Sequence, residues 1–276
     1  MASAERGAMP VLERLSMQII RRWLDTRTVG KHLYVFDEIE STNTALSALA
    51  REGAEEGTVV LAESQSRGRG RLGQPWFSPA GVNLYASVLF RKGISVGEIG
   101  PFSFLASLAV TDAIKDLGLT PAIKWPNDVL IERKKVAGAL TELASRGAAV
   151  DYVVLGVGVN LNVDAAQLHA ALGPAGAAAT SVAAALGRPV DRSVFAAAYL
   201  GRLEAWLLRY RSSGPAPIIA AWRERDILTG RRVELRSPAE TLSGRAIGID
   251  EQGRLLVRTA QGQRRVIVTE EIRVLD

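Results

Sequence analysis

Apolar residues recur along the chain with two spacings, one typical of strands and the other typical of helices. The segment Leu33–Ile39 carries the β-branched and aromatic residues of a strand. Ser41 can cap a helix that runs through Arg51, and Gly53 can end it. The same criteria predict further strands at Thr58–Glu63, Asn83–Phe90, Ala122–Trp125, Asp128–Glu132, Val136–Ala144 and Tyr152–Val159.

Helical spacing appears on both sides of these strands. Residues 1–10 are expected to form a tail, Val11–Thr26 has the spacing of a short helix, and Ile99–Leu117 that of a long one ended by Gly118. Further helices are expected at Ala165–Leu172, Ser181–Leu186, Arg192–Arg211 and Pro217–Arg225. Because strands follow one another directly and helices group around them, the order predicts a layered α+β domain.

The pattern changes near Asp226, where short apolar runs separated by glycines begin. Strands are predicted at Val233–Leu235, Leu242–Ile249, Leu255–Thr259 and Arg264–Val268, with hairpin connections between them. This is the pattern of a small all-β barrel. The chain therefore divides into an N-terminal tail and helix over 1–29, a main domain over 30–226 and a β-domain over 227–276.

Composition narrows the classes of function. With 47% hydrophobic and 23% charged residues, the 276-residue chain can bury a sizeable core. The chain has no cysteine, which excludes disulfides and thiolate sites, and its two histidines, His32 and His169, leave little for a histidine metal site. No apolar run approaches the ~20 residues of a membrane span, and no signal peptide is evident, so the expected location is cytoplasmic.

The densest chemical signal is the Arg/Gly loop, Gln65–Phe77, in which arginines alternate with glycines between Arg67 and Arg71. Glycines let the backbone approach a ligand, and guanidinium groups bind phosphate or carboxylate through two hydrogen bonds. The alternative is a solvated basic loop. Pro75-Trp76-Phe77 and a strand follow immediately, which favours a loop anchored to a folded core.

Polar clusters at other strand ends are individually weaker signals. In Lys124-Trp125-Pro126-Asn127-Asp128, the lysine can meet an anion and the last two residues can hold a nucleotide, a metal-bound water or a backbone group. A structural β-turn is the alternative reading. Either Lys134 or Lys135 could reach a site or lie at a basic hairpin tip. Gly156 and Gly158, inside an apolar strand, indicate close backbone approach, and Asn160 follows them.

Taken in order and spacing, these motifs closely resemble those of the biotin protein ligases. The resemblance covers Leu33–Asn162 in detail, and the small C-terminal β-domain also fits the family. It implies a class II synthetase-like domain, with a central mixed sheet flanked by helices, and an SH3-like barrel. The matching motifs are Ser41-Thr42-Asn43, Gln65-x-x-Gly68-Arg69-Gly70-Arg71, Trp76-Phe77-Ser78-Pro79-x-Gly81-x-Asn83-Leu84, Lys124-Trp125-Pro126-Asn127-Asp128, Lys135-Val136-Ala137-Gly138 and Gly156-x-Gly158-x-Asn160.

The resemblance implies that the chain uses ATP to convert biotin to biotinyl-5′-AMP. It then transfers the biotin to one lysine of a biotin carboxyl carrier protein domain of an acyl-CoA carboxylase. Both the biotin carboxylate and the α-phosphate are anionic, so Mg²⁺ and cationic side chains must offset their repulsion. The catalytic residues implied for this task are Arg69, Arg71 and Lys135, with Lys135 rather than Lys134 aligned to the family's active-site lysine.

The resemblance also assigns the remaining site residues. Those expected around biotin are Ser41, Thr42, Asn43, Gln65, Arg69, Gly70, Arg71 and Lys135. Those expected around ATP and the adenylate are Trp76, Lys124, Asn127, Asp128 and Asn160. Asp128 either assists Mg²⁺ or holds Lys124 in place. The Arg/Gly loop is expected to order on ligand binding, and Arg67, outside the shared motif, is expected to matter least.

Three questions stay open at this point. Some family members carry an N-terminal winged helix, but only about 30 residues precede the first strand here, so a monofunctional ligase without specific DNA binding is expected. A lipoate ligase is the nearest alternative enzyme. The alternative that is not an enzyme is a basic nucleic-acid-binding module. An aromatic content of 6% counts against it, because such modules stack bases on aromatic side chains. The sequence is compatible with a monomer or a homodimer.

Overall fold

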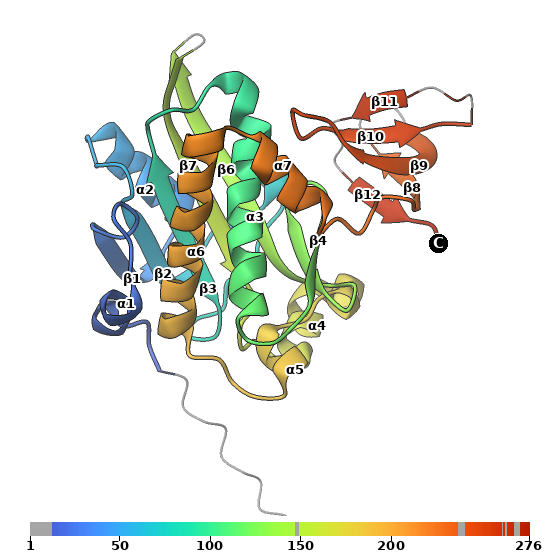
Figure 1. The fold of residues 1–276 in the computed structure, drawn as a ribbon. Helices are drawn as coiled ribbons and strands as arrows, with labels where there is room; N and C mark the ends of the chain where they lie inside the picture. The colour runs from blue at the N-terminus through green and yellow to red at the C-terminus, as the bar shows by residue number, and fades with distance from the viewer. Residues whose placement is uncertain (1–12, 147–148, 237–240, 261, 263, 268–270) are drawn as a thin grey trace, which may run out of the picture.

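The computed structural model describes residues 13–146, 149–236, 241–260, 262, 264–267 and 271–276. Most of them form a large domain built on one seven-stranded sheet, and the chain ends in a smaller sheet beside it (Figure 1). The predicted tail over 1–10 lies outside the described residues. None of the described helices is both long and apolar enough to cross a membrane.

The large sheet is mixed, as expected, and has the strand order β1-β2-β3-β7-β6-β5-β4. β1 and β2 run parallel, whereas every other neighbouring pair is antiparallel. The strands are β1 (Leu33–Ile39), β2 (Val59–Gln65), β3 (Leu84–Phe90), β4 (Pro121–Lys124), β5 (Asp128–Ile131), β6 (Lys134–Arg146) and β7 (Ala149–Val159).

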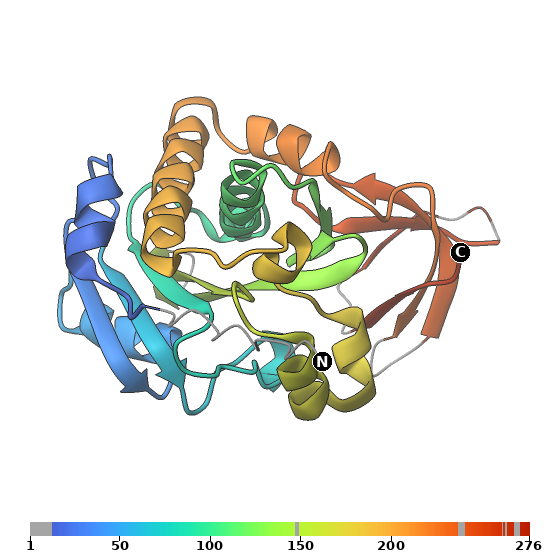
Figure 2. The same cartoon turned by 90° about the horizontal axis from the view of Figure 1, so that it is seen from below.

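Helices cover both faces of this sheet, which explains why its central strands are apolar throughout. Along β2, Val59 and Leu61 face the main core, while Val60 between them faces a second cluster that includes Leu46. Figure 2 shows α3 and α6 together on one face of the sheet. The helices are α1 (Met17–Trp23), α2 (Thr42–Arg51), α3 (Ile99–Lys115), α4 (Ala165–Leu172), α5 (Val182–Leu186), α6 (Arg192–Ser213) and α7 (Ala216–Arg223).

Two buried charged residues of α6 attach the N-terminal segment to the large domain. Arg192 forms a buried ion pair with Glu63 at 2.8 Å and donates a second hydrogen bond to the Glu13 carbonyl. Glu204 accepts backbone hydrogen bonds from residues 27, 28 and 29. Helix α1 spans Met17–Trp23, shorter than the predicted Val11–Thr26, because the chain is extended after Trp23 and is held by these contacts instead.

The C-terminal unit is a five-stranded antiparallel sheet with the order β11-β10-β9-β8-β12. Its last strand was not predicted from the sequence. The apolar side of the sheet, including Leu235 and Val257, continues the main hydrophobic core, so the two units pack together. The strands are β8 (Arg232–Arg236), β9 (Thr241–Ile249), β10 (Leu255–Arg258), β11 (Arg264–Ile267) and β12 (Glu271–Val274).

Candidate functional site

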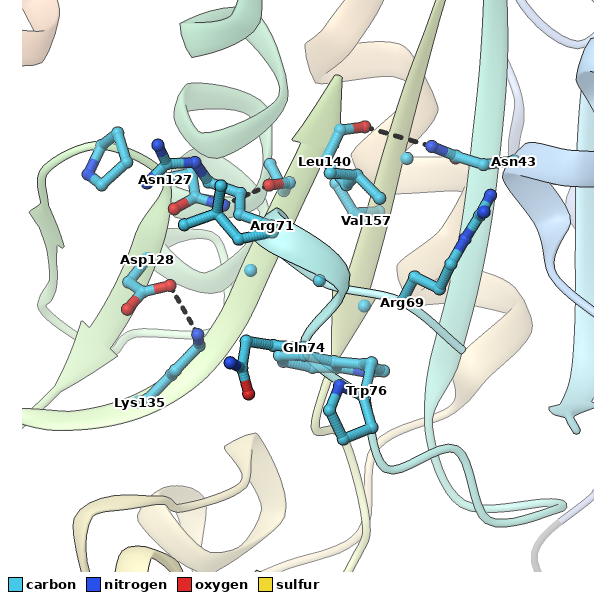
Figure 3. A pocket seen from close by; sticks show the side chains of 18 of the residues that line it. Asn43, Arg69, Arg71, Gln74, Trp76, Asn127, Asp128, Lys135, Leu140 and Val157 are labelled. Atoms are coloured by element: carbon cyan, nitrogen blue, oxygen red, sulfur yellow. Dashed lines mark hydrogen bonds and ion pairs between the residues drawn. The ribbon is translucent and has the colours of Figure 1, made fainter. Parts of the chain in front are cut away.

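A cavity of about 700 Å³ lies over β6 and β7, bordered by the start of α2, the Arg/Gly loop and the turn between β4 and β5 (Figure 3). Ile272 of β12 also lines it, so the C-terminal sheet contributes to its wall. The structure brings together every site residue predicted from the sequence except Asn160. Those lining the cavity are Ser41, Thr42, Asn43, Gln65, Arg69, Gly70, Arg71, Trp76, Lys124, Asn127, Asp128 and Lys135.

Neutral polar groups gather where α2 begins beside the end of β2. Ser41 occupies the N-cap position, but its side chain makes no capping hydrogen bond, so the expected capping role is wrong in this respect. The backbone N–H of Thr42 instead donates to Gln65 Oε1 at 2.9 Å. Gln65 Nε2 donates to Ser78 Oγ at 3.0 Å, which links the start of α2 to the chain beyond the Arg/Gly loop.

Two glycines of β7 receive side chains from other parts of the chain, as their positions in an apolar strand predicted. A Cβ at Gly156 would lie 2.1 Å from Asn43 Oδ1, and a Cβ at Gly158 would lie 2.3 Å from Trp76 Nε1. A residue with a side chain at either position would displace Asn43 or Trp76, so glycine allows both close approaches. Nε1 of Trp76 is buried and has no hydrogen-bond partner among the described residues.

Lys135 projects into the cavity from the start of β6. Its Nζ lies 2.6 Å from Asp128 Oδ1 and 5.4 Å from the centre of the Trp76 ring (Figure 3). Both partners are partly exposed, Lys135 by 39% and Asp128 by 24%. The ammonium group can therefore meet both the carboxylate and an aromatic ring face, and it remains accessible to a ligand.

The neighbouring lysine, Lys124, is held by the C-terminal sheet. Its Nζ donates to the carbonyl of Ile272 at 2.9 Å, and Trp125 Nε1 donates to the carbonyl of Gly253 at 2.8 Å. The sequence left two roles open for Asp128, a contact with Mg²⁺ or a contact that holds Lys124. The closest cation to the Asp128 carboxylate in the described contacts is the ammonium group of Lys135.

The two arginines predicted to be catalytic differ in their surroundings. Arg69 is bound by Glu142 at 3.1 Å and by Thr44 Oγ1 at 3.0 Å, on the side of the loop near α2. Arg71 lies over the Trp125 ring, 6.0 Å from its centre. Burial lowers the pKa of Arg71, and the nearby Asp128 carboxylate partly offsets that effect. Both side chains line the cavity, which places two guanidinium groups at its loop side.

Two predicted residues support the backbone of the site. Asn127 lines the cavity, and its side chain donates to the carbonyl of Ala139, tying the turn after β4 to β6. Asn160 does not line the cavity and lies just after β7, which ends at Val159. It is buried, and its Nδ2 donates to the Thr180 carbonyl at 3.1 Å. Its contact with the adenylate stays a prediction.

The acidic residues near the cavity determine what kind of metal ion binding it could support. The described residues contain no cluster of three or more histidine, cysteine, aspartate or glutamate side chains that could hold a metal ion. Among the described residues lining the cavity, Asp128 is the one acid. Mg²⁺ that enters with a nucleotide needs only one or two protein carboxylates in addition to phosphate oxygens. The site therefore fits a nucleotide-bound metal better than a resident one.

Comparison with known proteins identifies the family. The family model described as "Biotin/lipoate A/B protein ligase family" matches residues 35–160, and "Biotin protein ligase C terminal domain" matches residues 228–272. Biotin–[acetyl-CoA-carboxylase] ligase of Mycobacterium tuberculosis is 35% identical over 269 residues, which cover 93% of this chain and 96% of that protein. The chain belongs to the biotin protein ligase family.

Other biotin protein ligases agree with this assignment. Bifunctional ligase/repressor BirA of Bacillus subtilis is 34% identical over 254 residues, 92% of this chain and 77% of that protein. The solved structure of biotin protein ligase from Aquifex aeolicus in complex with biotin and ATP has a TM-score of 0.74 and 25% identity. The matched region covers 88% of this chain and 99% of that chain. The family's α+β fold with a small C-terminal sheet is thus confirmed.

Several cavity residues of this biotin protein ligase were not predicted as site residues. Gln74 and Leu140 line the cavity, and Ile272 reaches it from a strand that the sequence did not reveal. Gln74 lies inside the Arg/Gly loop, so the loop's composition could have indicated it. Leu140 and Ile272 look like ordinary core residues, and only the packing of β6 and β12 brings them to the cavity.

Proposed function

We propose that this chain is an ATP-dependent ligase that joins biotin to AMP and then transfers the biotin to a lysine of a biotin carboxyl carrier domain. The observation that carries the proposal is the division of one cavity. Neutral hydrogen-bonding groups lie near the start of α2, with Arg69 on the loop beside them, and the cationic side chains of Arg71 and Lys135 lie farther along, toward Asp128 and the start of β6. A ligand with a polar neutral ring and a carboxylate fits that division.

The neutral end of the cavity would hold the ureido ring of biotin. That ring presents two N–H donors and one carbonyl acceptor, and Ser41, Thr42, Asn43 and Gln65 supply groups of both kinds. Gly156 leaves room for the Asn43 side chain to lie against β7 at this end of the cavity. The carboxylate at the other end of the ligand would then extend toward the cations.

At the cationic end, a carboxylate oxygen of biotin would attack the α-phosphorus of ATP. A bond forms between that oxygen and phosphorus, the α–β anhydride bond breaks, and pyrophosphate leaves. Because both reactants are anionic, Arg69, Arg71 and Lys135 would act by lowering their repulsion and stabilising the charge on the phosphoryl oxygens. Trp76 and Asn127 are the proposed neighbours of the adenylate, and Lys124 of its phosphates.

The second step would release AMP. The ε-amine of the carrier lysine attacks the acyl carbon of the adenylate, an amide bond forms, and the bond to the AMP oxygen breaks. Mg²⁺ is proposed to arrive with ATP, and Asp128 is the cavity carboxylate that could bind it. The names of relatives support the carrier, since the Mycobacterium tuberculosis protein is a biotin–[acetyl-CoA-carboxylase] ligase. The cytoplasmic location and the division into domains stay predictions.

Biotin is favoured over lipoate by the chemistry of the neutral end. The dithiolane ring of lipoate has no N–H and no carbonyl, so it would leave the polar groups around Gln65 without partners. The test is ATP–pyrophosphate exchange with biotin or lipoate as the only acyl substrate, followed by AMP release with and without a carrier domain. Exchange is expected with biotin and carrier-dependent AMP release after it. Exchange that depends on lipoate alone would refute the proposal.

A further inference from the structure

A buried serine that the sequence did not single out lies behind the neutral end of the cavity. Ser87, at the centre of β3, has no solvent exposure and does not line the cavity. Its Oγ lies 2.8 Å from Thr42 Oγ1 and 2.6 Å from Asn43 Oδ1. Ser87 is therefore in direct contact with two of the residues proposed to bind biotin.

Ser87 belongs to a hydrogen-bonded cluster that also contains Thr42, Asn43, Gln65 and Ser78. Two backbone carbonyl groups at the edges of this cluster fix the direction of most of its hydrogen bonds. The Trp76 carbonyl can only accept, so Ser78 Oγ donates to it at 2.9 Å and must itself accept from Gln65 Nε2. Gln65 Oε1 therefore faces Thr42 and accepts its backbone N–H. On the other side, Asn43 Nδ2 points to the Leu140 carbonyl at 3.4 Å, so Asn43 Oδ1 faces Ser87 (Figure 3 shows the Asn43–Leu140 contact).

Between these fixed ends, two hydroxyl protons serve three contacts, and one of the protons must lie between Thr42 Oγ1 and Ser87 Oγ, which are 2.8 Å apart. In one arrangement Thr42 donates to Gln65, at 3.2 Å, and Ser87 donates to Thr42, so that Asn43 Oδ1 receives no proton from Ser87. In the other, Thr42 donates to Ser87 and Ser87 donates to Asn43, so that Gln65 Oε1 keeps only its backbone donor. In each arrangement one acceptor beside the cavity has capacity for a further N–H.

We infer that Ser87 is a positioning residue, whose hydroxyl group contacts both Thr42 and Asn43 but can donate only one proton, and so leaves one acceptor of the cluster available to a ureido N–H of the ligand. The inference rests on the proposed function, because it assigns the donor to biotin. It adds to that proposal a reason for N–H recognition at this end of the cavity. A buried acceptor left without a donor is costly, so a ligand that supplies the N–H is favoured over one that cannot.

The test compares Ser87→Thr with Ser87→Val, which add the same number of atoms at the same place and differ in the hydroxyl group. Biotin dissociation constants are measured by calorimetry without ATP, and the KM for ATP is measured by pyrophosphate exchange. We expect Ser87→Thr to bind biotin within about threefold of the parent and Ser87→Val to bind about tenfold more weakly than Ser87→Thr. The KM for ATP is expected to be the same in both variants.

A second measurement separates positioning from packing. Biotin methylated on one ureido nitrogen lacks one N–H, and each of the two isomers is compared with biotin on each variant. In Ser87→Thr, one methylated isomer is expected to bind much more weakly than biotin does. In Ser87→Val the difference between that isomer and biotin is expected to be smaller, because the valine side chain no longer holds the acceptor in place. Equal losses in both variants, or equal affinity of both variants for biotin, would overturn the inference.

Two further outcomes are distinguished by design. Failure of the parent chain to bind biotin would refute the proposed function, whereas biotin binding that is insensitive to the Ser87 hydroxyl would refute only the positioning role. If both branched variants fail to fold, Ser87→Ala adds no atom and replaces them. In that variant a biotin dissociation constant equal to that of the parent overturns the inference, and a rise of about tenfold with unchanged KM for ATP supports it.

Discussion

Replacing Lys135 by alanine is expected to slow the formation of biotinyl-AMP by about 10²–10³-fold, the range found when a preorganised electrostatic donor is removed. The substitution has two effects in this cavity. It removes the cation that would face the reacting carboxylate and phosphate. It also leaves the Asp128 carboxylate, 2.6 Å from Nζ in the intact protein, without this partner beside two anionic substrates.

The two effects can be separated by their magnitudes. At an effective dielectric constant of about 20, unit charges 4 Å apart interact by about 4 kcal/mol. Water reaches both groups, since Lys135 is 39% and Asp128 24% exposed, so the repulsion from an unpaired Asp128 is reduced to about 1 kcal/mol. This corresponds to roughly fivefold in rate. The double variant Lys135→Ala/Asp128→Asn is therefore expected to react about fivefold faster than Lys135→Ala.

The assay is single-turnover formation of biotinyl-AMP from ATP labelled at the α-phosphate. Lys134→Ala is the matched control, because Lys134 is adjacent, exposed and outside the cavity lining; it is expected to react within twofold of the parent. A normal rate for Lys135→Ala would refute the role assigned to Lys135. A double variant slower than Lys135→Ala would show that Asp128 has a role of its own, such as binding Mg²⁺.

Three further substitutions test the cavity wall, the domain contact and a partly buried carboxylate. Gly158→Ala places a methyl group 2.3 Å from the indole nitrogen beside it, so adenylate formation should fall at least tenfold. Trp125→Phe removes the donor to the Gly253 carbonyl, which should lower the free energy of unfolding in urea by about 1–3 kcal/mol. Burial raises the pKa of Glu56, but hydrogen bonds from Arg211 and two backbone N–H groups outweigh that effect and hold the pKa below its ordinary value. The stabilisation by Glu56 is complete above the unfolded-state pKa and lost as pH falls through the folded-state pKa, so the destabilisation by Glu56→Gln should shrink in acid.

Each of these substitutions has a control or a contrary outcome. Gly201→Ala, in α6, meets no atom within 4 Å and should leave the rate unchanged. Trp23→Phe affects an indole that is 61% exposed and should leave stability within about 0.5 kcal/mol. Equal losses from test and control substitutions would refute the first two predictions. A Glu56→Gln difference that is constant from pH 7 to pH 3 would refute the third.

The sequence predicted elements whose signals are local. Leu33–Ile39 was assigned to its full extent, because β-branched and aromatic residues are bounded there by polar turns. Strand β12 was missed, because the four residues Glu271–Val274 have too short a pattern to stand out and form a strand only by pairing with β8. Helix α1 was predicted too long, because its boundaries depend on contacts with α6 rather than on its own spacing.

The residues of the candidate site also divide into those with a local sequence signal and those that only tertiary packing reveals. Trp76 and Lys135 could be predicted because each belongs to a motif with a distinctive composition. Ser87 could not, since a serine inside the apolar strand β3 looks like a small core residue. Its significance appears only when α2 places Thr42 and Asn43 against it. The sequence also does not reveal that Asn160, placed just after β7, is buried beside the cavity instead of lining it.

The two glycines of β7 also determine a distance within the site. Gly156 and Gly158 lie on the same face of one strand, two residues apart, which corresponds to about 6.6 Å. Asn43 comes from α2 and Trp76 from the Arg/Gly loop, and each packs against one of these glycines. β7 thus fixes the distance between the polar end of the cavity and its aromatic side. This spacing does not depend on how the Arg/Gly loop is arranged. A side chain at either glycine would displace Asn43 or Trp76 and change the shape of that part of the cavity.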